Sequence, residues 1–257
     1  MKPAVVPRLL LGGSLLCLAM ACPARTIKVC IPANPFPPLT FPDREGQGQW
    51  LVRKAVERQG DAVEFEAVPW VRCTDGVAAG TYDVAMPPSA HAAFLPTMAF
   101  PMAAGQVDQG RAVGSVTLVA LRRVGSRAYW DGTSFSGLTT PVMFNKGVVT
   151  VREKLARLGV PGDEGASANE SLLNKLLLGR GEILVLNAQQ AAEEVASDEF
   201  RGKLEILPTP FLSFTLHAAF NRKFQAAQPA YVEAIWTEIG RLRASPEWSR
   251  VAPTLAK

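Results

Sequence analysis

The chain has few histidines and little net charge, and each shortage argues against a class of function. His91 and His217 are the two histidines among 257 residues, which argues against a metal site built from several histidines. The net charge is +4, and the first 21 residues hold two of these charges, on Lys2 and Arg8. The remaining +2 is too weak for the concentrated basic face that binds nucleic acid. We therefore expect no metal, no cofactor and no nucleic-acid partner.

The chain also lacks an internal repeat, a low-complexity tract and an apolar run long enough for a membrane span. The apolar run from Leu9 to Ala21 covers 13 residues, too few to cross a bilayer comfortably. Hydrophobic residues make up 48% of the chain and charged residues 19%, which is ordinary for a protein with a sizeable core. A length of 257 residues allows one large domain or two smaller ones.

The first 21 residues are predicted to be a signal peptide. Lys2 and Arg8 form its basic start, Leu9 to Leu18 its apolar centre, and Ala19-Met20-Ala21 its cleavage signal. Cleavage after Ala24 is an alternative. Cys22 raises a second alternative, a lipid anchor on the first residue after the cut. Such sites usually carry a large aliphatic residue three positions before the cysteine, where this chain has Ala19, so we favour export without an anchor.

Export makes a disulfide possible between Cys30 and Cys73, because Cys17 lies in the leader and Cys22 at its edge. Cys30 and Cys73 both lie near the ends of segments predicted to belong to one sheet, and an oxidising compartment permits their pairing. Closing a loop of 43 residues would stabilise the fold by about 4 kcal/mol in the chain-entropy model. The alternative is a pair of buried free thiols.

The stretch from Val63 to Met86 predicts a strand, a loop, a helix and a second strand. Val63, Phe65 and Ala67 alternate with acidic residues, Pro69 ends the strand, and a helix runs from Arg72 to Gly80. Trp70 is expected in the loop, at the sheet edge where open α/β folds bind ligands. An earlier strand over 27–32 and a helix over 49–59 extend this pattern to a doubly wound sheet.

A second α/β unit is predicted between about residues 118 and 208. A strand over 115–122 leads away from the first sheet, and Ile183 to Leu186 forms a buried strand after which Asn187 begins a helix. Thr150 and Glu153 have the spacing of a capping box that opens another helix. Pro208 and Pro210 mark the return crossing before a strand over 216–220, and a helix over 229–242 follows.

The order of these segments resembles the extracellular solute-binding proteins of family 3, periplasmic proteins best known from polar amino-acid ABC transporters. The resemblance is carried by IKVCIPANPFPPLTF, VPWVRCTDGVAAGTYDVA, GRGEILVLN and LHAAFNRKF, and it covers nearly all of the mature chain. The Pro-Trp-x-Arg-Cys segment, with a partner cysteine in the first strand, looks like a subgroup of this family.

The resemblance implies the α/β, two-lobed fold of type II periplasmic binding proteins, with two crossing hinge strands. Residues 22–117 and 209–257 would form lobe 1, and residues 118–208 lobe 2. It also implies a set of ligand-binding residues in the cleft: Phe36, Trp70, Pro88, Ser89, His91, Lys146, Gly147, Thr150 and Asn187. The aromatic residues have a core role as the alternative, Lys146 a solvated turn, and His91 a structural role.

Two departures from the family pattern argue against an α-amino acid as the ligand. Amino-acid binders of this family place an arginine a few residues after the Ser89 position, and here residues 90–94 read AHAAF. They also usually carry an acid where this chain has Asn187. Both partners of a zwitterion are therefore missing from the expected positions.

The resemblance predicts non-catalytic capture of a small molecule by a periplasmic monomer, for delivery to an ABC permease. One alternative is an enzyme on the same fold, such as a dehydratase of the cyclohexadienyl type, which needs a general acid over the ligand. Glu182 is the carboxylate that the resemblance places near the cleft. A further alternative is a sensory or accessory protein without a transport role.

Overall fold

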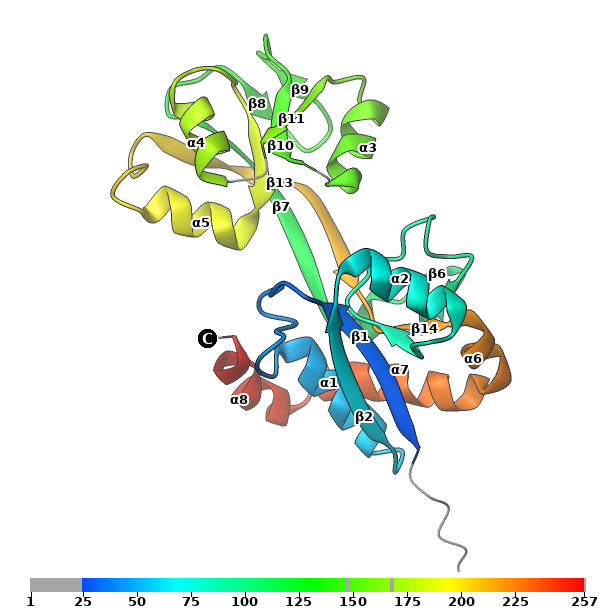
Figure 1. Ribbon diagram of the computed structural model, residues 1–257. Helices are drawn as coiled ribbons and strands as arrows, with labels where there is room; N and C mark the ends of the chain where they lie inside the picture. Colours follow the sequence, from blue (N-terminus) through cyan, green and yellow to red (C-terminus); the bar gives the residue numbers. More distant parts are fainter. Residues whose placement is uncertain (1–24, 147, 167–168, 257) are drawn as a thin grey trace, which may run out of the picture.

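The chain folds into two lobes connected by two long strands (Figure 1). The structure, a computed structural model, describes residues 25–146, 148–166 and 169–256. The predicted signal peptide, Cys22 and Gly147 lie outside the described residues. Each lobe contains its own five-stranded sheet with helices packed against it, so the predicted two-lobed α/β fold is confirmed.

Lobe 1 is built on the sheet with the strand order β2-β1-β3-β14-β4. Strand β1 pairs in parallel with both β2 and β3, which is the doubly wound arrangement, whereas β14 pairs antiparallel with β3 and β4. The elements of this lobe are β1 Thr26–Pro32, α1 Gln47–Glu57, β2 Ala62–Val68, α2 Trp70–Ala79, β3 Val84–Ala85, β4 Met98–Ala99, β5 Met102–Ala103, β6 Gln106–Val107, η1 Gln109–Arg111, β14 Ala219–Asn221, α6 Arg222–Ala227, α7 Pro229–Arg243 and α8 Pro246–Leu255.

Alternation along β1 divides the core of lobe 1 between the two faces of its sheet. Ile27, Val29 and Ile31 are buried in the cluster that α1 and α7 supply, whereas Cys30 belongs to a separate buried cluster with Val77 of α2. Successive side chains of a strand point to opposite faces, so β1 contributes to two helical layers, although Lys28, on the same face as Cys30, is exposed.

Helix α2 is attached to β1 by a disulfide bond. Cys30 and Cys73 are both buried and form the bond, with their Cα atoms 5.5 Å apart, so the predicted pairing is confirmed. The helix ends as predicted at Gly80, which has a φ of 84° and takes the left-handed conformation that suits glycine. The prediction that Trp70 lies in the preceding loop is wrong, because α2 begins at Trp70 directly after Pro69.

Lobe 2 is built on the sheet with the strand order β11-β10-β12-β7-β13. Strand β10 pairs in parallel with β11 and β12, and β7 pairs antiparallel with β12 and β13. Leu172, Leu173 and Leu176 of α4 are buried against one face of the sheet. The elements of this lobe are β7 Gly114–Arg123, β8 Tyr129–Trp130, β9 Phe135–Ser136, β10 Val142–Asn145, α3 Val149–Arg157, β11 Gly162–Ala166, α4 Asn169–Leu177, β12 Leu184–Asn187, α5 Ala188–Ala196 and β13 Leu204–Leu216.

Strands β7 and β13 run side by side from one lobe to the other (Figure 1). The return crossing predicted at Pro208 and Pro210 is strand β13, which continues through both prolines as a 13-residue strand. At these prolines the pairing of β13 with β7 shifts register, between Ile206 and Leu212. A proline cannot donate to the ladder, so the strand skips pairs at these positions without ending.

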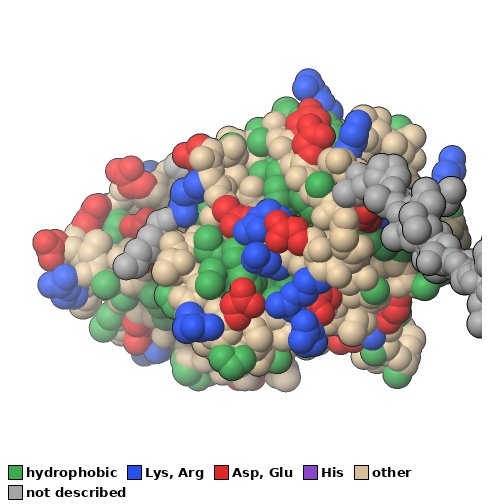
Figure 2. All heavy atoms as spheres, turned by 90° about the horizontal axis from the view of Figure 1, so that it is seen from below, with side chains coloured by type: hydrophobic (Ala, Val, Ile, Leu, Met, Phe, Trp, Pro, Cys, Tyr) green, Lys and Arg blue, Asp and Glu red, His purple; other side chains and the backbone are tan. Residues whose placement is uncertain are grey.

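The underside of lobe 1 carries basic and acidic side chains close together (Figure 2). Glu238 of α7, for example, forms ion pairs with Arg58 and Arg241. Charges of opposite sign alternate on this face, so it presents no concentrated basic patch. Among the helices of the described residues, none has the length and apolar character that crossing a membrane requires.

Candidate functional site

A cleft with three connected compartments lies where the two lobes meet. We call them the apolar compartment, of about 600 Å³, the polar compartment, of about 320 Å³, and the side compartment, of about 420 Å³. Phe214 of the crossing strand β13 lines all three. The crossing strand therefore forms the common wall of the cleft.

The apolar compartment receives residues from both lobes and from β13. Trp70 lies at the start of α2, and its ring meets the ring of Phe94 edge to face, with centroids 6.3 Å apart. The lining contains no Asp, Glu, Lys or Arg among the described residues, and His91 is its one titratable side chain. The largest apolar contributors are Phe36, Trp70, Phe94, Val148, Val149, Phe214 and Leu216. This surface suits a flat or aliphatic body rather than a charged one.

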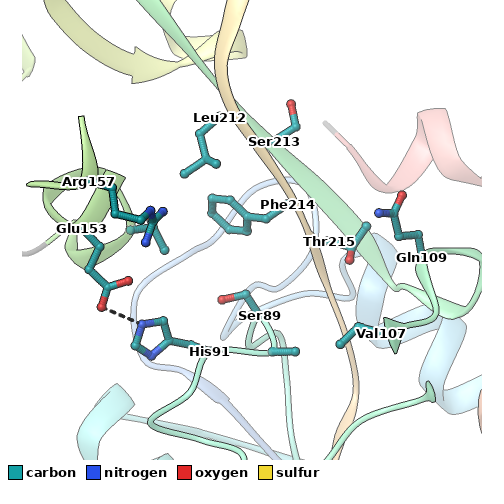
Figure 3. A pocket seen from close by; sticks show the side chains of 12 residues that line it. Ser89, His91, Val107, Gln109, Glu153, Arg157, Leu212, Ser213, Phe214 and Thr215 are labelled. Carbon is teal, nitrogen blue, oxygen red and sulfur yellow. Dashed lines mark hydrogen bonds and ion pairs between the residues drawn. The ribbon is translucent and has the colours of Figure 1, made fainter. Parts of the chain in front are cut away.

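The polar compartment contains an interaction that connects the two lobes. His91, in the segment that follows β3 in lobe 1, contacts Glu153 of α3 in lobe 2, with 3.0 Å between Nε2 and Oε1 (Figure 3). The amide of Ala93 donates to Nδ1 of the same ring at 3.2 Å. In a neutral imidazole the other nitrogen then carries the hydrogen, so Nε2–H donates to the Glu153 carboxylate.

Arg157 provides a second charged group in the polar compartment. It lies in the last turn of α3, one turn after Glu153, and both side chains extend from this helix toward the cleft (Figure 3). Hydroxyl and amide groups also line the compartment, from Ser89, Gln109, Thr150, Ser213 and Thr215, and its apolar surface comes from Ala90, Val107, Leu212 and Phe214. This compartment therefore suits a polar or charged group.

The side compartment lies between the proline-rich loop after β1 and the start of α5. Asn187 lines it and also caps α5, because its Oδ1 accepts the amide hydrogen of Gln189 at 2.9 Å. Phe36 and Val148 line both this compartment and the apolar one. Asn187 is thus adjacent to the apolar compartment without lining it.

The structure brings together six of the nine residues that the resemblance implies. Phe36, Trp70, Pro88, Ser89, His91 and Thr150 all line the apolar compartment. Asn187 lines the neighbouring side compartment, and Lys146 is exposed and lines none of the three. Gly147 lies outside the described residues.

The predicted capping box at Thr150 is wrong. Helix α3 begins at Val149 with Val148 as its N-cap, and no side chain caps it. The Glu153 side chain, which a capping box would turn back to the helix start, contacts His91 of the other lobe instead. A contact between the lobes thus replaces the local one that the spacing favours.

Several cleft residues have no distinctive signal in the sequence. Phe214 is one of many apolar residues in strand segments, and Phe94 follows a stretch of alanines. Arg157 reads as an ordinary cation in the last turn of a helix, a common position for a basic residue. Knowledge of which segments face each other across the cleft is needed to find them.

Glu182 lies away from the cleft. Its carboxylate accepts hydrogen bonds from the backbone amides of Thr139 and Thr140, and it lines none of the three compartments. The amide of Thr139 is the largest cause of a lowered pKa, so the carboxyl group stays ionised near neutral pH. Among the described residues, no group of three or more His, Cys, Asp or Glu side chains is placed to hold a metal ion.

Comparisons with known proteins find structural similarity without sequence similarity. No protein-family profile matches the chain, and no curated protein matches its sequence. A histidine kinase sensor domain with similarity to periplasmic binding proteins is similar in structure, at 16% sequence identity and a TM-score of 0.62. The L-cystine solute receptor of Neisseria gonorrhoeae has 15% identity and a TM-score of 0.60. The GluR0 ligand-binding core from Nostoc punctiforme has 14% identity and a TM-score of 0.59.

The similarity extends over almost the whole of each structure. The alignments cover 90%, 91% and 89% of this chain, and 96%, 93% and 96% of the sensor domain, the cystine receptor and the GluR0 core. The structural alignments establish the fold of the chain. Sequence identities this low do not identify its ligand. The chain therefore has the two-lobed fold of the periplasmic binding proteins.

Proposed function

We propose that this protein captures a small molecule with an apolar body in the cleft between its lobes, without chemical conversion. The observation that carries the proposal is the apolar compartment, which joins aromatic side chains of lobe 1 to Val148 and Val149 of lobe 2. Its volume of about 600 Å³ lies in the range of small-molecule sites. A ligand that touches both lobes would stabilise their closed arrangement.

The fold and the predicted leader support a transport context. We propose export to the periplasm, action as a monomer and delivery of the ligand to an ABC permease. The proposed lobe boundaries fall at 117/118 and 208/209, within or beside the crossing strands β7 and β13. Solved structures with this fold include the substrate-binding protein of an amino acid ABC transporter, but also a histidine kinase sensor domain.

The ligand proposed here is not a standard α-amino acid. Some similar structures bind amino acids, such as the GluR0 core in complex with L-glutamate. The apolar compartment of this chain has no carboxylate and no Arg or Lys among its described lining residues. Burying an unpaired ammonium or carboxylate costs several kcal/mol, so a zwitterion in this compartment would be bound weakly.

A thermal-shift screen tests this proposal. The screen compares the twenty amino acids with aromatic and aliphatic monocarboxylates, their amides and uncharged aromatic compounds, and calorimetry follows each hit. A ligand at about 100 times its Kd stabilises the fold by about 2.7 kcal/mol. For a protein of this size that corresponds to a rise of roughly 5–10 °C in Tm. We expect hits only among compounds with an apolar body.

Substitution at the start of α2 assigns the hits to the cleft. Trp70→Ala removes the largest aromatic surface of the apolar compartment, and we expect it to weaken binding about tenfold or more. Val71→Ala is the control, since Val71 is the next residue of the same helix, is 70% exposed and lines none of the three compartments. Micromolar binding of a common amino acid, or equal effects of the two substitutions, would contradict the proposal.

The enzyme alternative loses its main candidate residue. Glu182 is held by backbone amides outside the three compartments, and its lowered pKa opposes a role as a general acid. Glu153 reaches the polar compartment, but it already accepts a hydrogen bond from His91. We expect a direct assay to detect no turnover of prephenate or arogenate.

A further inference from the structure

The polar compartment is a direct extension of the apolar compartment. The two share Ser89, His91, Thr150 and Phe214 among their lining residues. In Figure 3 the Ser89 hydroxyl points into the space between His91 and Phe214, where the two compartments meet. A molecule whose body lies against Trp70 can therefore extend a polar end into the polar compartment.

Arg157 is a cation in this compartment without an ionic partner among the described residues. No ion pair and no hydrogen bond joins its guanidinium to another described side chain or backbone group. Arg152, on the same helix, is different, because its Nη2 lies 2.9 Å from Oε2 of Glu164. Arg157 is exposed at the edge of the compartment, and guanidinium groups bind carboxylates through paired hydrogen bonds, so its donors are available to a group that arrives from solvent.

A neighbouring cation adds to the positive charge at the end of α3. Lys154 is partly buried and donates to the backbone carbonyl of Phe211. Burial is the main cause of its lowered pKa, and the charge of Arg157 lowers that pKa further. A negative charge beside Arg157 would relieve this repulsion.

We propose that the polar compartment binds a carboxylate through Arg157, and that the ligand is a monocarboxylate whose apolar body occupies the apolar compartment. This inference rests on the proposed function and specifies its ligand class. Arg157 binds the carboxylate oxygens, and the hydroxyl groups of Ser89 and Thr150 donate to the same group at the boundary of the two compartments.

Glu153 limits the ligand to one negative charge. Its carboxylate lies in the same compartment, one helical turn from Arg157, and repels a second anionic group. His91 donates one hydrogen bond to that carboxylate at 3.0 Å, which leaves its negative charge in place. The compartment therefore favours a simple carboxylate over a dicarboxylate.

Three probes with the same body isolate the charged end: 3-phenylpropionate, 3-phenylpropionamide and L-phenylalanine. Calorimetry measures the Kd of each with the wild-type protein. We expect the acid to bind about tenfold more tightly than the amide, as one charge-assisted contact provides, and L-phenylalanine to bind more weakly than the acid. Indole-3-acetate with its amide, and octanoate with its amide, repeat the comparison with other bodies.

Two variants assign the preference to one residue. In Arg157→Gln we expect the affinity for each acid to fall about tenfold, while the affinity for each amide stays within about twofold. Arg152→Gln is the matched control, since it removes a guanidinium from the same helix that does not line the compartment, and it should change neither.

The possible failures separate this inference from the proposed function. If wild-type protein binds amides and acids equally, or if Arg157→Gln keeps the acid preference, the carboxylate subsite is wrong and apolar capture stands. If L-phenylalanine binds more tightly than 3-phenylpropionate, the exclusion of α-amino acids in the proposed function is wrong, whereas the carboxylate subsite stands. If none of the acids and amides binds, the apolar capture proposal and the subsite are both wrong.

Discussion

His217 is completely buried at the end of β13, where it is held in its neutral form. Its Nε2 lies 3.2 Å from the backbone oxygen of Asp108, and no described residue provides a hydrogen bond to Nδ1. The ring of Phe100 meets it edge to face. Burial lowers its pKa, with Arg243 as a smaller cause, because a charged imidazole would lose its hydration in this position.

The lowered pKa of His217 predicts a loss of stability in mild acid. The unfolded chain binds a proton near pH 6.5, whereas folded His217 does so at a lower pH. The contribution of neutral His217 to the free energy of unfolding is therefore fully present above about pH 6.5. It is lost as the pH falls through the folded pKa, at a rate of at most about 1.4 kcal/mol per pH unit. Urea denaturation of wild-type and His217→Gln protein between pH 7.5 and pH 5 measures this.

The difference between the two proteins isolates His217, because every other side chain is the same in both. We expect the variant to be less stable at pH 7.5, because it disturbs a packed site, and to lose less stability on acidification. Parallel curves for the two proteins over this pH range would show that the folded pKa of His217 is ordinary.

Helix α2 is the element in which fold and site are most closely connected. Its first residue, Trp70, lines the apolar compartment, and three residues later Cys73 binds it covalently to Cys30 of β1. The amide of Cys73 also donates to the carbonyl of Pro69 at 3.0 Å, which holds the first turn together. The disulfide thus fixes the start of the helix that presents Trp70.

Removal of the disulfide is expected to destabilise the protein by about 4 kcal/mol, because the unfolded chain regains the freedom of a long loop. Urea denaturation of the Cys30→Ala, Cys73→Ala double variant measures the loss. Mass spectrometry of unreduced, unfolded wild-type protein after alkylation is the control, and neither cysteine should react. Alkylation of both thiols before reduction would contradict the bond.

At the scale of the whole molecule, strands β7 and β13 join two bodies that also meet across the cleft. His91 and Glu153 form a contact between the lobes, and their side chains are 26% and 43% exposed. Partly exposed pairs contribute between zero and about 1 kcal/mol, so the contact biases the closed arrangement without holding it shut. Such a weak bias lets a ligand control the equilibrium.

Loss of this contact is expected to open the unliganded molecule slightly. In Glu153→Ala, which removes the acceptor, the ratio of open to closed molecules should rise by no more than about fivefold, the change that 1 kcal/mol produces. Small-angle X-ray scattering would record it as a larger radius of gyration, which a saturating ligand reverses. Glu164→Ala, which breaks the Arg152 pair within lobe 2, is the control and should leave the radius unchanged.

The predictions from sequence agree with the structure where the cause is local. Gly80 ends α2 because a left-handed residue is needed there, and Pro229 begins α7 because the first turn needs no donor from that position. Thr150 shows the opposite result, because a contact with the other lobe turned Glu153 away from the start of α3.

The sequence by itself determined the two α/β units, the pairing chemistry of Cys30 and Cys73, and most of the helices and strands. These depend on periodicity, turn residues and redox environment, which act over short stretches of chain. The tertiary structure alone decided which distant residues share one cavity. Arg157 and Ser89 line the same compartment from opposite lobes, whereas Lys146 lines none of the three. The folding of each lobe and the path of β7 and β13 set which side chains share the cleft.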